Sequence, residues 1–234
     1  MEKTSPIRLL LVDDHRLTRT GVSRLLRDEA DIAVVGETNS GEKALALLER
    51  EPFNRPDVVM MDARMPGIGG IEAAHQIRAD YPQIKVLGIS SIATGVVPSQ
   101  MLRAGALGFL TKNIGVEELV KAIHMVAAGQ HYVSPEVASK LSLDPFNNTR
   151  KPLFDKLSRR EMQISQMLTD GKRVSQIAEY LKLSPKTVYS YRYRIFEKLG
   201  IRSDVELTIL AVKHGLTENI RELDNLPAFH TLAG

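Results

Sequence analysis

Residues 9–15, LLLVDDH, join a continuous apolar run to two adjacent carboxylates. Four apolar residues in succession are typical of a strand that is buried on both faces of a parallel sheet. An apolar run that ends in an acid returns at residues 58–62 as VVMMD. Because ligands collect at the carboxyl ends of strands in open parallel sheets, the two acidic ends predict a shared site.

Strand-like and helix-like segments alternate on both sides of this stretch. The short apolar runs are Ile7–Val12, Ile32–Val35, Val58–Met61, Lys85–Ile89 and Ala106–Leu110. Apolar residues at helical spacing separate them, as at 116–126. Five such units predict an α/β domain over residues 7–129, with a doubly wound, five-stranded parallel sheet.

The chain changes character after residue 129. Three prolines among polar residues predict a linker over 130–155, with a short helix at Pro135–Leu141. Residues 156–215 carry no strand pattern and predict an all-α, four-helix domain, followed by a tail at 216–234. Capping signals place the four helices near 159–169, 174–182, 185–199 and 204–214.

Composition excludes several classes of protein. The 234 residues include no cysteine, which excludes disulfide scaffolds and cysteine-ligated metal sites. No apolar run reaches the roughly 18 residues that a membrane span needs. The amino terminus lacks the pattern of a secretory signal. We therefore expect a cytoplasmic location and no membrane partner.

The net positive charge of the chain comes from its second half. Residues 1–129 carry 15 basic and 16 acidic side chains, whereas residues 150–213 carry 14 basic and 7 acidic side chains. A phosphate backbone attracts such a basic excess. The charge distribution thus favours a nucleic-acid partner for the second half.

Polar groups follow the predicted strands of the first half. Asp13, Asp14 and Asp62 come after the first and third strands, Ser90 ends the fourth, and Lys112 follows the fifth. Converging carboxylates repel one another unless a cation is present, and Mg²⁺ is the hard cation that prefers such oxygen ligands. A carboxylate nucleophile beside a metal, a hydroxyl and an ammonium suits the acceptance of a phosphoryl group.

The helices expected at 174–182 and 185–199 fit a helix-turn-helix. Apolar residues at helical spacing predict the buried face of the second helix: Val188, Ile195 and Leu199. Polar and aromatic residues share another face that can lie in a DNA major groove: Lys186, Tyr189, Ser190 and Tyr193. The neighbouring cations Arg192 and Arg194 are expected to meet phosphates.

Four strings in the first half resemble the receiver domains of two-component response regulators. They are LLLVDDH, VVMMDARMPGIGG, IKVLGIS and AGALGFLTK. The resemblance implies a flavodoxin-like receiver over 7–129, whose phosphoacceptor is Asp62 and whose partner is a sensor histidine kinase. It also implies a Mg²⁺ site formed by Asp13, Asp14, Asp62 and the main-chain carbonyl of Arg64. Ser90 and Lys112 would contact the phosphoryl oxygens, and Phe109 would be the switch aromatic.

Residues 157–207 resemble the LuxR-type DNA-binding domain. With the receiver, the architecture is similar to the NarL/FixJ class, and LSPKTV, YSYRYRIFEKL and SDVEL are especially similar to the GacA/UvrY/SirA subgroup. The resemblance implies double-stranded DNA with inverted repeats as target and a homodimer formed on phosphorylation. It further implies that the unphosphorylated receiver covers or misorients the binding helix. The candidate DNA-binding residues are Val174, Ser184, Lys186, Thr187, Val188, Tyr189, Ser190, Arg192, Tyr193 and Arg194.

One position departs from that subgroup, in which an asparagine usually stands where this chain has Tyr189. Tyrosine can stack or donate one hydrogen bond, but it cannot make the paired amide contact of asparagine with adenine. We therefore expect a different target sequence with the same docking.

Three other functions compete with a phosphorylation-controlled regulator. A ligand-sensing LuxR-type factor needs a large apolar pocket where this chain places acids. A Mg²⁺-dependent phosphatase needs a second carboxylate two residues after Asp62, where Arg64 stands, so we expect no enzyme. A receiver that acts by protein contacts alone, without phosphorylation, is the remaining alternative.

Overall fold

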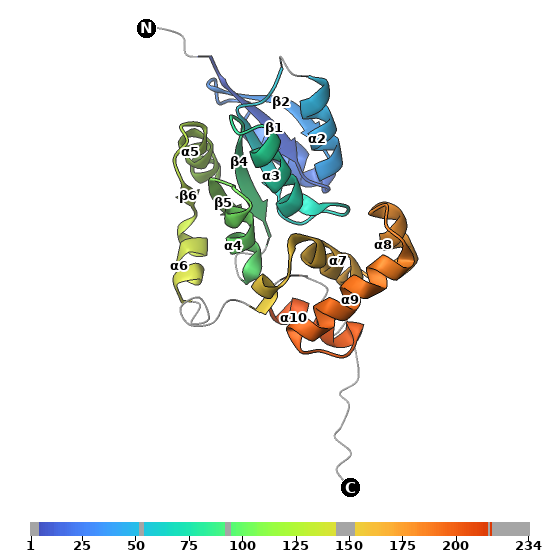
Figure 1. The fold of residues 1–234 in the computed structure, drawn as a ribbon. Helices are drawn as coiled ribbons and strands as arrows, with labels where there is room; N and C mark the ends of the chain where they lie inside the picture. The colour runs from blue at the N-terminus through green and yellow to red at the C-terminus, as the bar shows by residue number, and fades with distance from the viewer. Residues whose placement is uncertain (1–4, 52–53, 92–94, 144–152, 215, 217–234) are drawn as a thin grey trace.

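The computed structural model describes residues 5–51, 54–91, 95–143, 153–214 and 216. They form an α/β unit followed by a helical unit (Figure 1). The predicted tail at 216–234 lies outside the described residues except for Leu216, which is buried in the helical unit. None of the described helices is both long and apolar enough to cross a lipid bilayer.

All strands of the α/β unit are parallel, in the order β2-β1-β3-β4-β5-β6. Their bounds are Ile7–Val12, Ile32–Thr38, Val58–Asp62, Lys85–Ser90, Gly108–Thr111 and Tyr132–Val133 for β1 to β6. The predicted doubly wound parallel sheet is confirmed, but the sheet has six strands rather than five. The prediction missed β6, which pairs with β5 inside the segment expected to be a linker, because two residues are too short to show a strand pattern.

Helices cover both faces of the sheet and bury its central strands, whereas residues of the edge strands β2 and β6 stay partly exposed. The bounds of the helices are Arg16–Leu25, Gly41–Arg50, Gly69–Asp80, Val96–Arg103, Val116–Ala127 and Pro135–Leu143 for α1 to α6. The side chains of α2, α3 and α4 form one apolar core with the sheet, and those of α1 and α5 form the other. This double cover explains why the strands are continuous apolar runs rather than alternating ones.

The helical unit consists of the four expected helices and a short 3₁₀ helix, η2, which was not predicted and lies at the end of the segment expected to be a linker. The bounds are Leu153–Lys156 for the 3₁₀ helix η2, then Arg159–Thr169, Val174–Tyr180, Pro185–Leu199 and Asp204–Lys213 for α7 to α10. The predicted caps are present, because the side chains of Ser158, Ser184 and Ser203 each accept a hydrogen bond from the amide three residues on. Gly200 ends α9 in the left-handed conformation, with φ of 70°.

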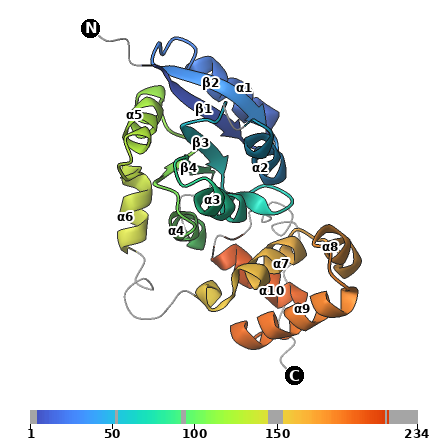
Figure 2. The ribbon, with the colours of Figure 1, turned by 45° about the horizontal axis from the view of Figure 1, so that its top comes forward.

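The two units are packed against each other along α3 and α4 (Figures 1 and 2). Arg103 of α4 forms an ion pair with Asp155 of η2. The guanidinium of Arg159 lies 2.7 Å from His75 Nδ1, between α7 and α3. Val96 at the start of α4 is buried in the core of the helical unit, so part of the α/β unit completes that core.

Glu161 holds the first turn of α7 and links it to α9. Its side chain is 4% exposed and accepts hydrogen bonds from the Ser158 amide at 2.7 Å and from Lys198 Nζ at 2.6 Å. Burial alone would raise the pKa of this carboxyl, but these hydrogen bonds outweigh burial and lower the pKa below 4.5.

We expect Glu161→Gln to lower the free energy of unfolding by about 1–2 kcal/mol at pH 7. Because the pKa of Glu161 is lower in the folded than in the unfolded protein, its contribution is present above pH 4.5 and is lost as the pH falls further. Urea unfolding at pH 7 and pH 3.5 measures the difference. The control is Glu197→Gln on the exposed side of α9. An equal loss at both pH values would contradict the role of the ionised carboxylate.

Candidate functional site

The fold brings two buried carboxylates together at the carboxyl edge of the sheet. Asp13 follows β1 and is 2% exposed, and Asp62 ends β3 and is 3% exposed. Between them lies the ammonium of Lys112, which follows β5. Its Nζ is 2.6 Å from Asp13 Oδ2 and 2.7 Å from Asp62 Oδ2. The parallel register of three strands thus places one cation against two acids.

The pKa of Asp62 lies above that of an ordinary surface aspartate. Burial raises the pKa of its carboxyl to about 6, although the Lys112 ammonium and the Arg64 amide lower the pKa and Asp13 raises it further. Burial alone would lower the pKa of Lys112, but the charges of Asp62 and Asp13 outweigh burial and raise it. At neutral pH the site therefore holds an ionised, poorly solvated carboxylate beside a fixed positive charge.

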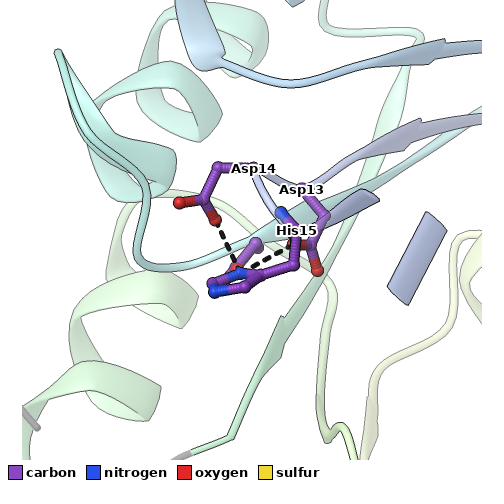
Figure 3. Close-up of side chains that lie close together, drawn as sticks. Asp13, Asp14 and His15 are labelled. Atoms are coloured by element: carbon purple, nitrogen blue, oxygen red, sulfur yellow. Dashed lines mark hydrogen bonds and ion pairs between the residues drawn. The ribbon is translucent and has the colours of Figure 1, made fainter. Parts of the chain in front are cut away.

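Asp14 and His15 complete the acidic cluster. His15 Nδ1 lies 2.9 Å from Asp14 Oδ1 and 3.3 Å from Asp13 Oδ1 (Figure 3). One ligand atom from each of Asp13, Asp14, His15 and Asp62 lies within 4.8 Å of the others. The sequence prediction did not include His15, although its position directly after two acids was the available signal.

The other predicted residues of this site come from β4, β5 and the loop after β3. Ser90 ends β4, is 1% exposed and stands opposite Thr111 of β5. The ring of Phe109 is fully buried in the core shared with α4. A Cβ added at Gly88 would lie 2.9 Å from that ring, so the glycine makes room for it. The Arg64 amide donates a 3.0 Å hydrogen bond to Asp62 Oδ1.

The loop between β3 and α3 connects the acidic cluster to the helical unit. Burial raises the pKa of Asp170, which follows α7, and the charge of the Arg64 guanidinium nearby offsets part of that rise. Tyr180 of α8 contacts the same loop, because a Cβ added at Gly67 would lie 2.4 Å from its hydroxyl. Asp170 and Tyr180 carry no sequence signal, since contacts between units depend on how the units dock.

The face predicted to enter DNA is open to solvent. Tyr189 is 55% exposed and Tyr193 is 71% exposed, while three polar neighbours on α9 are exposed as well: Lys186, Ser190 and Arg194. The receiver therefore does not cover this face of α9, so the first of the two expected modes of inhibition, a covered helix, is not seen. The second, a misoriented helix, stays a prediction.

The other predicted DNA-binding residues have structural partners within the helical unit. The side chain of Val188 is fully buried and that of Val174 packs against the same core, so a contact of either residue with DNA would have to come from its main chain. Ser184 caps α9 with its side chain, and its hydroxyl lies 2.8 Å from that of Thr187. Arg192 forms a bidentate ion pair with Asp204, at 2.8 and 2.7 Å.

Comparison with known families accounts for both units. Residues 9–124 match the family described as response regulator receiver domain. Residues 155–211 match the family described as bacterial regulatory proteins, luxR family. The chain belongs to the response regulators of two-component systems. It combines a receiver domain with a LuxR-type DNA-binding domain, as the sequence predicted.

Curated relatives of this response regulator match it over nearly their whole length. Response regulator GacA of Pseudomonas protegens is 49% identical, over 91% of this chain and 98% of the relative. Response regulator UvrY of Escherichia coli K12 is 45% identical, over 90% of this chain and 95% of the relative. The predicted similarity to the GacA/UvrY subgroup is therefore confirmed.

Solved structures share the fold of this response regulator. The response regulator ChrA of a haem-sensing two-component system aligns over 92% of this chain, with a TM-score of 0.50 and 29% identity. RcsB of Salmonella typhimurium aligns over 90% of this chain, with a TM-score of 0.70 and 23% identity. At that identity the likeness to RcsB concerns the fold alone.

Proposed function

We propose that this response regulator accepts a phosphoryl group on Asp62 from a sensor histidine kinase and that this modification controls its binding to DNA. The observation that carries the proposal is the buried Asp62 carboxylate at the end of β3, beside the Lys112 ammonium at 2.7 Å. In the kinase, the donor would be a phosphohistidine, whose phosphorus–nitrogen bond is the bond that breaks.

The residues of the site fit each step of such a transfer. An oxygen of the ionised Asp62 carboxylate attacks phosphorus, and the histidine nitrogen of the donor leaves and takes up a proton. With a pKa of about 6, Asp62 is mostly ionised at neutral pH. The Lys112 ammonium is already in place to pair with a phosphoryl oxygen, and Ser90 stands one strand away. The product gains roughly 1 to 2 negative charges.

We propose Mg²⁺ as the cofactor of this transfer. Carboxylate oxygens are the ligands that Mg²⁺ prefers, and two of the acids are buried, where neighbouring negative charges repel most strongly. Asp13, Asp14, Asp62 and the main-chain carbonyl of Arg64 would hold the ion. When bound, it supplies charge neutralisation at the transferring phosphoryl oxygens.

The decisive experiment incubates the full chain with acetyl phosphate and Mg²⁺ and follows its intact mass. We expect the mass to rise by one phosphoryl group, and hydroxylamine to remove the group because it cleaves acyl phosphates. A mass that does not change would contradict the proposal and favour a receiver that acts by protein contacts alone. A group that resists hydroxylamine would indicate an ester on a hydroxyl side chain instead.

Removal of the Lys112 charge should strengthen cation binding. We expect Lys112→Met to bind Mg²⁺ at least about tenfold more tightly than wild type, because the ammonium repels an ion held by the same carboxylates. Isothermal titration calorimetry measures the affinity. The control is Lys121→Met, which removes an exposed charge from α5. Weaker binding by Lys112→Met would place the ion away from Asp13 and Asp62.

We propose that the DNA-binding unit, residues 156–215, binds double-stranded DNA at inverted-repeat promoter sites through α9. The basic excess of this region and the exposed Tyr189 and Tyr193 support the proposal. We also propose that phosphorylation of the receiver, residues 7–129, favours a homodimer, and that the protein works in the cytoplasm. The apolar side chains of Val205 and Ile209 on α10, 68% and 48% exposed, offer a surface for a second copy.

The exposed cations of α9 predict a salt dependence of DNA binding. We expect Arg194→Ala to weaken binding on all sequences and to reduce the slope of log affinity against log salt by about 1, because one phosphate contact is lost. Fluorescence anisotropy with a labelled duplex at several salt concentrations measures this slope. Lys140→Ala, on α6 after the receiver, is the control. An unchanged slope in Arg194→Ala would exclude contact between this side chain and phosphate.

A further inference from the structure

His15 occupies a helix-capping position without performing that function. It is the N-cap residue of α1, yet its side chain makes no capping hydrogen bond. Serine, threonine, aspartate and asparagine are the residues that usually cap a helix. The imidazole is instead turned towards Asp14 and Asp13, as Figure 3 shows. The side chain is 66% exposed, so an ion from solvent can reach it.

The distances around His15 match those between neighbouring ligands of one metal ion. With bonds of 2.0–2.1 Å, adjacent ligands of an octahedral ion lie about 3 Å apart and opposite ligands about 4.2 Å apart. His15 Nδ1 lies 2.9 Å from Asp14 Oδ1 and 3.3 Å from Asp13 Oδ1. The whole set, including Asp62, lies within 4.8 Å. Small side-chain movements therefore suffice to place all four ligand atoms around one ion.

We propose that His15 is a further ligand of the acidic site and makes it a site for transition-metal cations as well as for Mg²⁺. This inference rests on the proposed function, because it assumes that the acids hold a cation. Carboxylates suit Mg²⁺, whereas imidazole nitrogen suits the first-row transition metals and binds them more tightly in the order from Mn²⁺ to Ni²⁺ and Cu²⁺. One nitrogen in the set therefore raises transition-metal affinity and changes Mg²⁺ affinity little.

The experiment compares the full-length wild type with His15→Ala and His15→Asn at a fixed pH. Calorimetric titrations with Mg²⁺ and with Ni²⁺ give the affinities, and pulsed electron paramagnetic resonance of bound Mn²⁺ detects a nitrogen ligand directly. His15→Asn introduces a residue that can cap α1. Comparing it with His15→Ala therefore separates the loss of a metal ligand from fraying of the helix. The control is His124→Ala on α5, whose Nε2 lies 3.1 Å from Asp31 Oδ2, away from the site.

We expect both His15 variants to lose at least about tenfold in Ni²⁺ affinity and to lose the nitrogen coupling of Mn²⁺. Their Mg²⁺ affinity should stay within about twofold of wild type, and the control should behave as wild type in every measurement. Wild type that binds Mg²⁺ and Mn²⁺ but shows no nitrogen coupling of the bound Mn²⁺ would overturn the role of His15 alone. Equal Ni²⁺ affinities in wild type and both variants would overturn it too. Wild type that binds none of these ions would overturn the inference together with the proposed Mg²⁺ site.

Discussion

Asp62→Asn is expected to abolish the mass gain that acetyl phosphate and Mg²⁺ produce in the wild type. Asparagine has nearly the same shape, but its amide lacks the anionic oxygen that attacks phosphorus. The neighbouring acids Asp13 and Asp14 remain, and neither lies at the end of β3. We expect the rate of phosphorylation to fall at least about a hundredfold, which corresponds to about 2.7 kcal/mol in the barrier.

Asp57→Asn is the matched control for this experiment. Asp57 precedes the same strand at its other end, and its carboxylate accepts a 2.8 Å hydrogen bond from the Arg8 amide. It therefore shares the strand with Asp62 but not the edge where the acids meet. Asp57→Asn should be labelled like wild type. A label that persists in Asp62→Asn would show that another residue is the phosphoacceptor.

Gly70→Ala should be among the most damaging single substitutions in the receiver. Gly70 lies in the first turn of α3, which packs directly on the end of β3. A Cβ at this position would lie 1.8 Å from the main-chain oxygen of Asp62 and 2.8 Å from its carbonyl carbon. The neighbour is backbone within a buried strand, so it cannot move aside as a flexible side chain can. We expect a loss of about 3 kcal/mol or more in the free energy of unfolding.

Gly21→Ala provides the matched control, because the same substitution meets open space there. Gly21 lies within α1, and a Cβ would meet nothing within 4 Å. Alanine is the better helix former, so this variant should gain about 0.5–1 kcal/mol. Urea unfolding of the two variants and the wild type measures both changes. A loss below about 1 kcal/mol in Gly70→Ala would show that α3 can move away from β3 at little cost.

The sequence predicted the parts of this fold that repeat a strong local pattern. The bounds of β1, α7 and α9 agree with the prediction, because apolar runs, capping serines and Gly200 mark them. β5 begins at Gly108 rather than Ala106, since an apolar run continues from the preceding loop into the strand. β6 escaped prediction because its pairing with β5, rather than its own pattern, makes it a strand.

The residues of the candidate site were predictable where the order of the strands fixes their positions. They were not predictable where a side chain has several possible partners and only the folded structure shows which one it contacts. Asp13, Asp62 and Lys112 meet because their strands are adjacent and parallel. Arg192 shows the opposite case, because its spacing on α9 does not reveal that Asp204 pairs with it. The orientation of His15 towards the acids is equally invisible in the sequence.

The face of α9 that is predicted to enter DNA is exposed while the two units are packed together, which limits how the receiver can control DNA binding. Tyr189 and Tyr193 stay in solvent while the receiver is docked on α7 and η2 through residues such as Arg159 and Asp155. A surface that is already accessible gains nothing from being unmasked. With the phosphorylation and the homodimer proposed above, we therefore expect the signal to change DNA occupancy through the distance and orientation between two chains, or through the rigidity with which each chain holds α9.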